Sequence, residues 1–86
     1  MNIVSFNQII ELNHLLQKKD LQFKVHIRDA CGAQSFYIEQ LEDSNRVETD
    51  EDLFNTIDDY FKNEKMIVVY LDDKYRFKIQ QYASQN

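Results

Sequence analysis

The spacing of hydrophobic residues changes twice along the chain, from the period of a helix to the period of a strand. In residues 5–18 apolar side chains recur every three or four positions, with Ile9 and Leu12 on one stripe, as on the buried face of a helix. Residues 23–28 then alternate strictly between apolar and polar, which is typical of a strand with one buried face. The same succession returns in the second half. This order predicts one α+β domain over residues 1–86 with the succession αββαββ.

Capping signals place the ends of the two helices. Ser5 and Gln8 have the spacing of a capping box, in which each side chain bonds a backbone N–H at the other position. The cations at residues 18–19 suit the negative end of the first helix. Thr49 stands before the acidic residues 50–52, so we expect it to cap the second helix.

The strand-like segments assign their residues to two faces. Residues 30–34, ACGAQ, separate the first two strands and predict a turn around the single glycine of the chain. The segment MIVVYLDD, residues 66–73, is apolar on both faces as far as Leu71, which favours a central strand. The side chains that we expect to point into the core are Phe23, Val25, Ile27, Phe36, Ile38, Ile67, Val69, Leu71, Tyr75, Phe77 and Ile79.

The two halves of the sequence correspond to one another as pseudo-repeats, residues 4–42 and 48–83. SFYIEQ aligns with RFKIQQ, and Phe23 aligns with Ile67. Two such units predict a four-stranded, mainly antiparallel sheet with both helices on one face. A crossover through the second helix and a central third strand give the expected strand order 2-1-3-4.

A sheet covered on one face leaves the other face open, and alternation predicts what it carries. Three interpretations stand: a solvated face, the contact of a sheet-on-sheet homodimer around Val68 and Tyr70, or a site for single-stranded nucleic acid or another anion, in which aromatic rings stack and cations hold phosphates. The residues expected there are Lys24, His26, Arg28, Tyr37, Glu39, Val68, Tyr70, Asp72, Arg76 and Lys78.

The charge of the chain is unevenly distributed. The net charge is −5, which weighs against non-specific binding to nucleic acid. Nine of the fifteen acidic residues fall between residues 42 and 64. A basic surface elsewhere is therefore compatible with an acidic protein.

The motif Arg28, Asp29, Cys31 and Gly32 contains the only cysteine beside the only glycine. A tight turn explains these residues, with Asp29 accepting turn N–H groups. The alternative is a thiol-dependent, redox-responsive site in which Arg28 favours the thiolate. One cysteine cannot form an internal disulfide, and no second cysteine is present to resolve an oxidised one.

Several other classes of function lack their sequence signals. His14, His26 and Cys31 have no paired zinc spacing, and a single glycine excludes the phosphate-binding and nucleotide-binding loops. We therefore expect no metal and no cofactor. The sequence lacks the pattern of a signal peptide and has no apolar run of membrane-spanning length, so we expect a cytoplasmic protein.

The stretch RDACG, followed by AQSF at residues 33–36, resembles the RDAC family, a small family of low-GC Gram-positive bacteria that takes its name from the motif. The similarity extends over the helix before the motif and the helix and hairpin after it. The resemblance implies a cytoplasmic bacterial protein and points to Arg28, Asp29, Cys31 and Gly32, but it gives them no role.

Together these patterns predict a non-enzymatic module that binds a protein partner, or a second copy of itself, through the open sheet face. The alternatives are a thiol-dependent protein centred on Cys31 and a binder of single-stranded nucleic acid or another anionic ligand. The expected binding residues are Lys24, His26, Arg28, Tyr37, Tyr70, Arg76 and Lys78.

Overall fold

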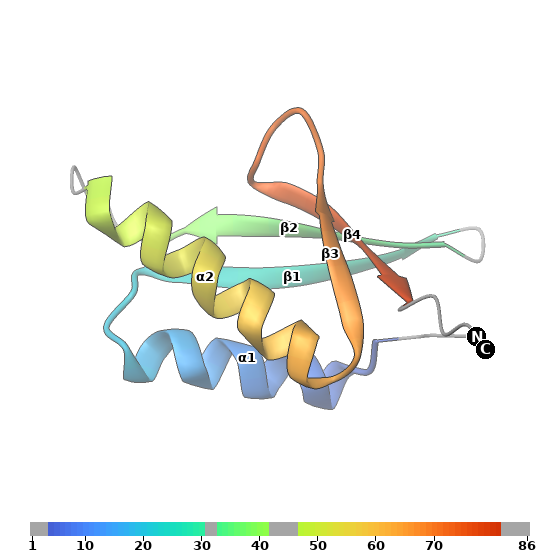
Figure 1. Cartoon of the computed structure of the whole chain (residues 1–86), viewed down its shortest axis with the longest axis horizontal. Helices are drawn as coiled ribbons and strands as arrows, with labels where there is room; N and C mark the ends of the chain where they lie inside the picture. The colour runs from blue at the N-terminus through green and yellow to red at the C-terminus, as the bar shows by residue number, and fades with distance from the viewer. Residues whose placement is uncertain (1–3, 31–32, 42–46, 82–86) are drawn as a thin grey trace.

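A computed structural model describes residues 4–30, 33–41 and 47–81 (Figure 1). Two helices and four strands follow in the predicted order αββαββ, and the α+β class is confirmed. The elements are α1 (Phe6–Lys18), β1 (Phe23–Ala30), β2 (Ala33–Gln40), α2 (Val47–Asn63), β3 (Met66–Tyr70) and β4 (Arg76–Gln81).

Helix α1 begins and ends where the sequence predicts. The Gln8 backbone N–H donates to Ser5 Oγ at 3.2 Å, and the Ser5 N–H donates to Gln8 Oε1 at 2.9 Å, which completes the capping box. The helix ends at Lys18, and Asp20 just beyond it has a left-handed backbone with φ 61°. Local sequence therefore determines both ends of this helix.

The predicted start of α2 is wrong by three residues, because a cap at Thr49 would begin the helix at Asp50. The helix begins at Val47, so Thr49 lies inside its first turn rather than at the cap. Each residue added before the expected cap gives one more backbone hydrogen bond, and Val47 and Glu48 are both compatible with a helix. Residues 42–46, where a cap would lie, are outside the described residues.

All strand pairs are antiparallel, but the strand order differs from the prediction. The order is β1-β2-β4-β3 rather than 2-1-3-4, and the apolar strand β3 lies at an edge. The centre is formed by β2 and β4, which are joined at Phe36↔Phe77 and Tyr37↔Arg76. The rings of Phe36 and Phe77 are fully buried and stack with centroids 5.1 Å apart. Packing of these two rings, which the hydrophobic pattern does not specify, accounts for the central pair.

The face prediction holds for β1, β2 and β4 and is wrong by one residue for β3. Met66, Val68 and Tyr70 pack toward the helices, whereas Ile67 and Val69 are 40% and 41% exposed on the other face. The reason lies in the connection after each helix.

Lys65 has a left-handed backbone (φ 63°) and leads directly into β3, whereas two residues separate Asp20 from β1. In the ladders Phe23 pairs with Gln40 and Met66 pairs with Gln81. Met66, not Ile67, therefore occupies the place of Phe23 in the second hairpin.

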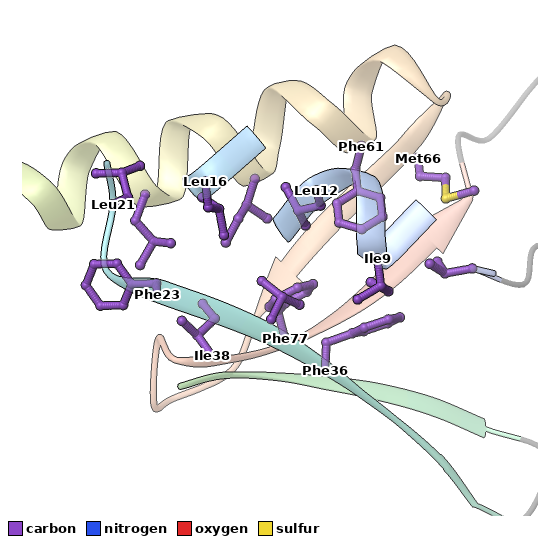
Figure 2. Packing of buried hydrophobic residues seen from close by; sticks show 14 residues of the cluster. Ile9, Leu12, Leu16, Leu21, Phe23, Phe36, Ile38, Phe61, Met66 and Phe77 are labelled. Carbon is purple, nitrogen blue, oxygen red and sulfur yellow. The ribbon is translucent and has the colours of Figure 1, made fainter. Parts of the chain in front are cut away.

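The hydrophobic core lies between the two helices and one face of the sheet (Figure 2). The largest fully buried side chains belong to Leu12 and Leu16 of α1, Leu53, Ile57 and Phe61 of α2, and Val25, Phe36 and Phe77 of the strands. Because both helices cover the same face, the opposite face of the sheet remains open, as predicted.

Candidate functional site on the open sheet face

The open face is basic on strands β1 and β4 and apolar at its β3 edge. Alternation along each strand places these side chains on one surface. They are Lys24, His26 and Arg28 of β1, Tyr37 and Glu39 of β2, Arg76 and Lys78 of β4, and Ile67 and Val69 of β3.

A row of His26, Tyr37 and Arg76 crosses three strands at the middle of this face. Tyr37 is the register partner of both His26 and Arg76. The rings of His26 and Tyr37 stack with centroids 4.8 Å apart and an angle of 12° between them. His26 Nε2 also lies 2.7 Å from Glu39 Oε1. The stack and the hydrogen bond fix the orientation of His26 and of the Tyr37 ring that stacks on it. Tyr37 nevertheless remains 41% exposed.

A cavity of about 630 Å³ lies beside this row, where the β3–β4 loop approaches β2. Arg28 and Arg76 approach it from two different strands, with Tyr37 between them. Its lining residues are Arg28, Ser35, Phe36, Tyr37, Ile38, Leu71, Asp73, Tyr75 and Arg76. Two guanidinium groups and a tyrosine ring suit a carboxylate or another planar anion, because arginine can bind such groups through two parallel hydrogen bonds.

Arg76 has one acidic neighbour at the cavity. Its Nε lies 3.8 Å from Asp73 Oδ2, and both side chains are more than half exposed. An exposed ion pair of this length contributes little to stability. The guanidinium is therefore able to exchange Asp73 for an incoming anion at small cost.

Tyr70 does not belong to the open face, contrary to the sequence prediction. Its ring packs edge-on against Phe54 of α2, with centroids 5.2 Å apart. Its hydroxyl donates to Asp58 Oδ1 at 3.0 Å. Val68 also packs against the core. Val68 and Tyr70, around which the sequence places a sheet-on-sheet dimer, therefore face the helices rather than the open face.

Sequence reasoning missed Ile67 and Val69 as members of the open face. Every residue from Met66 to Tyr70 is apolar, so this strand has no alternation that would reveal its faces. The backbone identifies the faces instead: Lys65, two residues beyond α2, has a left-handed conformation and leads directly into β3, which fixes where the strand begins.

Arg28 and Asp29 of the RDAC motif lie at the far end of β1. Arg28 and Asp29 are exposed neighbours on β1 and point to opposite faces of the sheet. Pairing between the strands continues to Ala30↔Ala33. Cys31 and Gly32 lie outside the described residues, so the thiol and turn interpretations both stay predictions.

The described residues offer no other site of a familiar type. Within residues 4–30, 33–41 and 47–81, no three histidine, cysteine or acidic side chains are grouped so that they could hold a metal ion. In the same ranges no helix has the length and apolar character required to span a membrane.

The ionisation of three tyrosines should make the stability of the fold depend on pH in the alkaline range. Burial raises the pKa of Tyr70, Tyr60 and Tyr75, and hydrogen bonds to Asp58, Glu11 and Asp50 respectively raise it further. An unfolded chain loses these protons near the ordinary pKa of 10.0, whereas the folded chain keeps them to higher pH. The stabilisation is therefore complete below about pH 10 and is lost as the pH rises above it.

Tyrosinate absorbance and circular dichroism in the same alkaline titration measure this effect. We expect these tyrosines to ionise together with unfolding. Ionisation of all five tyrosines near pH 10 with the fold intact would contradict the expectation.

Comparisons of the chain with protein-family models, with curated proteins and with solved structures find no match.

Proposed function

We propose that this protein is a non-enzymatic binding module of the cytoplasm whose open sheet face takes an acidic segment of a protein partner. The observation that carries the proposal is the cavity in which Arg28 and Arg76 flank the exposed Tyr37. The chain as a whole has a net charge of −5, so the concentration of cations on this one face is a local feature.

The arrangement suits an extended peptide better than a small ion. The cations Lys24, Arg28, Arg76 and Lys78 are distributed over β1 and β4, so a ligand must be long to meet them together. The exposed Ile67 and Val69 add apolar surface beside Lys78, because Val69 is its register partner. A segment that alternates acidic and apolar side chains would satisfy both parts of the surface.

Charge reversal in the cavity tests the proposal. The double variant Arg28→Glu with Arg76→Glu should lose binding of a fluorescent peptide of alternating glutamate and leucine, measured by fluorescence anisotropy at low salt. The matched control is Lys18→Glu with Lys65→Glu. It changes the net charge equally at two exposed positions, the last turn of α1 and the connection between α2 and β3. The control should bind as the wild type does.

A single-stranded oligonucleotide of equal charge serves as the competing ligand. Preference for the peptide supports the proposal. Preference for the oligonucleotide would replace the protein partner with nucleic acid, because stacking on Tyr37 would then dominate. Equal loss of binding in the control pair, or no binding of either ligand by the wild type, would overturn the proposal.

The thiol alternative has its own measurement. Because Arg28 and Asp29 offset one another in charge, we expect Cys31 to react with iodoacetamide no faster in the folded protein than in the urea-unfolded chain. Cys31 is the only thiol, so the measured rate belongs to it alone. A clearly faster reaction in the folded state would favour the thiol-dependent function over the binding module.

A further inference from the structure

The edge strand β3 presents backbone groups that bond to no strand of the described chain. The Leu71 N–H donates to the Arg76 carbonyl at 2.9 Å. Hydrogen-bonded pairs alternate along an antiparallel ladder, so every second residue before Leu71 also bonds to β4. The residues whose N–H and C=O point away from the sheet are Met66, Val68 and Tyr70.

The other edge of the sheet is closed at the corresponding point. The Asn13 side chain of α1 accepts from the Val25 N–H at 2.7 Å and donates to the Val25 carbonyl at 3.0 Å. The ladder registers equate Val25 with Val68. Asn13 follows the buried Leu12, and Asp58 follows the buried Ile57, so Asp58 occupies the place of Asn13 on α2.

The carboxylate of Asp58 cannot act as the amide of Asn13 does. A carboxylate has no N–H to give to a carbonyl, and Asp58 Oδ1 accepts instead from the Tyr70 hydroxyl. Among the described residues, a side chain closes the β1 edge at Val25, and no side chain closes the β3 edge at Val68.

A groove of about 370 Å³ lies between α2 and this edge. Asp58 and Lys62 of α2 lie along one side, and the β3 strand forms the other. Asp58 lies beside Tyr70 at the end of the strand, and Lys62 belongs to the last turn of α2, which leads back to Met66 at its start. A negative charge thus marks one end of the edge and a positive charge the other.

We propose that the β3 edge pairs with the β3 edge of a second copy of this chain, antiparallel about a two-fold axis at Val68. Val68 would face Val68 of the second copy, and Met66 would face Tyr70 of the second copy. This register uses the outward backbone groups of all three residues, in about six hydrogen bonds. The two four-stranded sheets would continue as one.

On both faces of the paired β3 strands, the two-fold axis brings side chains of one copy next to complementary side chains of the other. On the helix side, the axis brings Asp58 opposite Lys62 of the second copy, and the reciprocal pair forms as well. On the open face, Ile67 becomes the cross-strand partner of Val69 of the second copy, so that the exposed aliphatic side chains cover one another. An unrelated peptide would gain the backbone bonds but would match this order of charges only by coincidence.

Charge-reversal variants test the axis directly. In Asp58→Lys, and separately in Lys62→Glu, both symmetric contacts become like-charge pairs, so each variant should raise the dimer dissociation constant at least about tenfold in sedimentation equilibrium. Mixing the two variants recreates opposite charges at both contacts. Native mass spectrometry of the mixture should show heterodimers in excess of either homodimer.

Two further variants control for misfolding and for non-specific association. Lys18→Glu on α1 should dimerise like the wild type, and circular dichroism should show the same fold for every variant. Asp58→Asn recreates the amide that closes the β1 edge at Asn13, so it should favour the monomer.

Two results would overturn the proposal. A wild type that is monomeric at millimolar concentration overturns the proposal, and so does a mixture without preferred heterodimers. The Arg28→Glu, Arg76→Glu variant should dimerise normally, so the test does not depend on the open-face function.

Discussion

Replacing Phe77 with alanine is expected to lower the free energy of unfolding by about 3–5 kcal/mol. A domain of this length has a total stability of about 4–12 kcal/mol, so the substitution should remove a large fraction of it. The Phe77 ring is fully buried, and its neighbours come from every layer of the core. It stacks on Phe36 at 5.1 Å and meets Tyr70 and Phe61 edge-on at 5.8 and 6.2 Å.

The position of Phe77 makes this loss hard to compensate. Phe36 and Phe77 are register partners at the pair of strands that joins the two hairpins, and the repeat alignment equates these same two residues. A cavity at this point therefore weakens both halves at once. Urea titration followed by circular dichroism measures the change.

Phe6→Ala is the matched control, because Phe6 is 73% exposed on α1. We expect it to change stability by about 0.5 kcal/mol or less. Equal effects of the two substitutions would show that the central aromatic pair does not hold the sheet together.

Replacing Asn13 with alanine is expected to destabilise the fold by about 2–3 kcal/mol. The substitution removes both hydrogen bonds of the side chain to the backbone of Val25, at 2.7 and 3.0 Å, in a partly buried setting. Each lost bond leaves a backbone group without its partner, at a cost of about 1–3 kcal/mol where water cannot replace it. The better helix propensity of alanine offsets a small part of this loss.

Two further variants serve as a control and as a test of the separate hydrogen bonds. Gln17→Ala, one turn later on α1 and exposed, should be nearly neutral. Asn13→Asp keeps an acceptor for the Val25 N–H but places a carboxylate against the Val25 carbonyl, so it should be as harmful as alanine. A harmless Asn13→Asp would mean that the bond to the carbonyl contributes nothing.

The sequence predicts those parts of the fold that depend on neighbouring residues. The capping box at Ser5 and Gln8 needs only a separation of three residues, and it forms as expected. The faces of β1, β2 and β4 follow from strict alternation. The β3 strand has no alternation, so its faces were predicted one residue out of register.

The strand order is not predictable from the same information. It depends on whether β2 pairs with β4 or β1 pairs with β3, and both choices bury similar apolar strands. The deciding contact, Phe36 against Phe77, joins positions far apart in the chain. Hydrophobic pattern alone gives no preference between such distant partners.

The sequence predicts most of the residues on the open face but not the cavity that they line. Lys24, His26, Arg28, Tyr37, Arg76 and Lys78 lie on the open face as expected, and their role in binding remains a prediction. Tyr70 was misplaced for the same reason as the rest of β3. The cavity beside Tyr37 arises from the β3–β4 loop and the short β2–β4 pairing, which no local pattern specifies.

The junction between the two hairpins also has a kinetic consequence. Contacts between residues close in sequence hold each helix–hairpin unit together. Phe36 and Phe77, in contrast, must meet although about forty residues of chain separate them. Closing such a loop costs entropy before any contact compensates for it. We therefore expect the meeting of β2 and β4 to limit the rate of folding, with the local hairpins already forming in the unfolded ensemble.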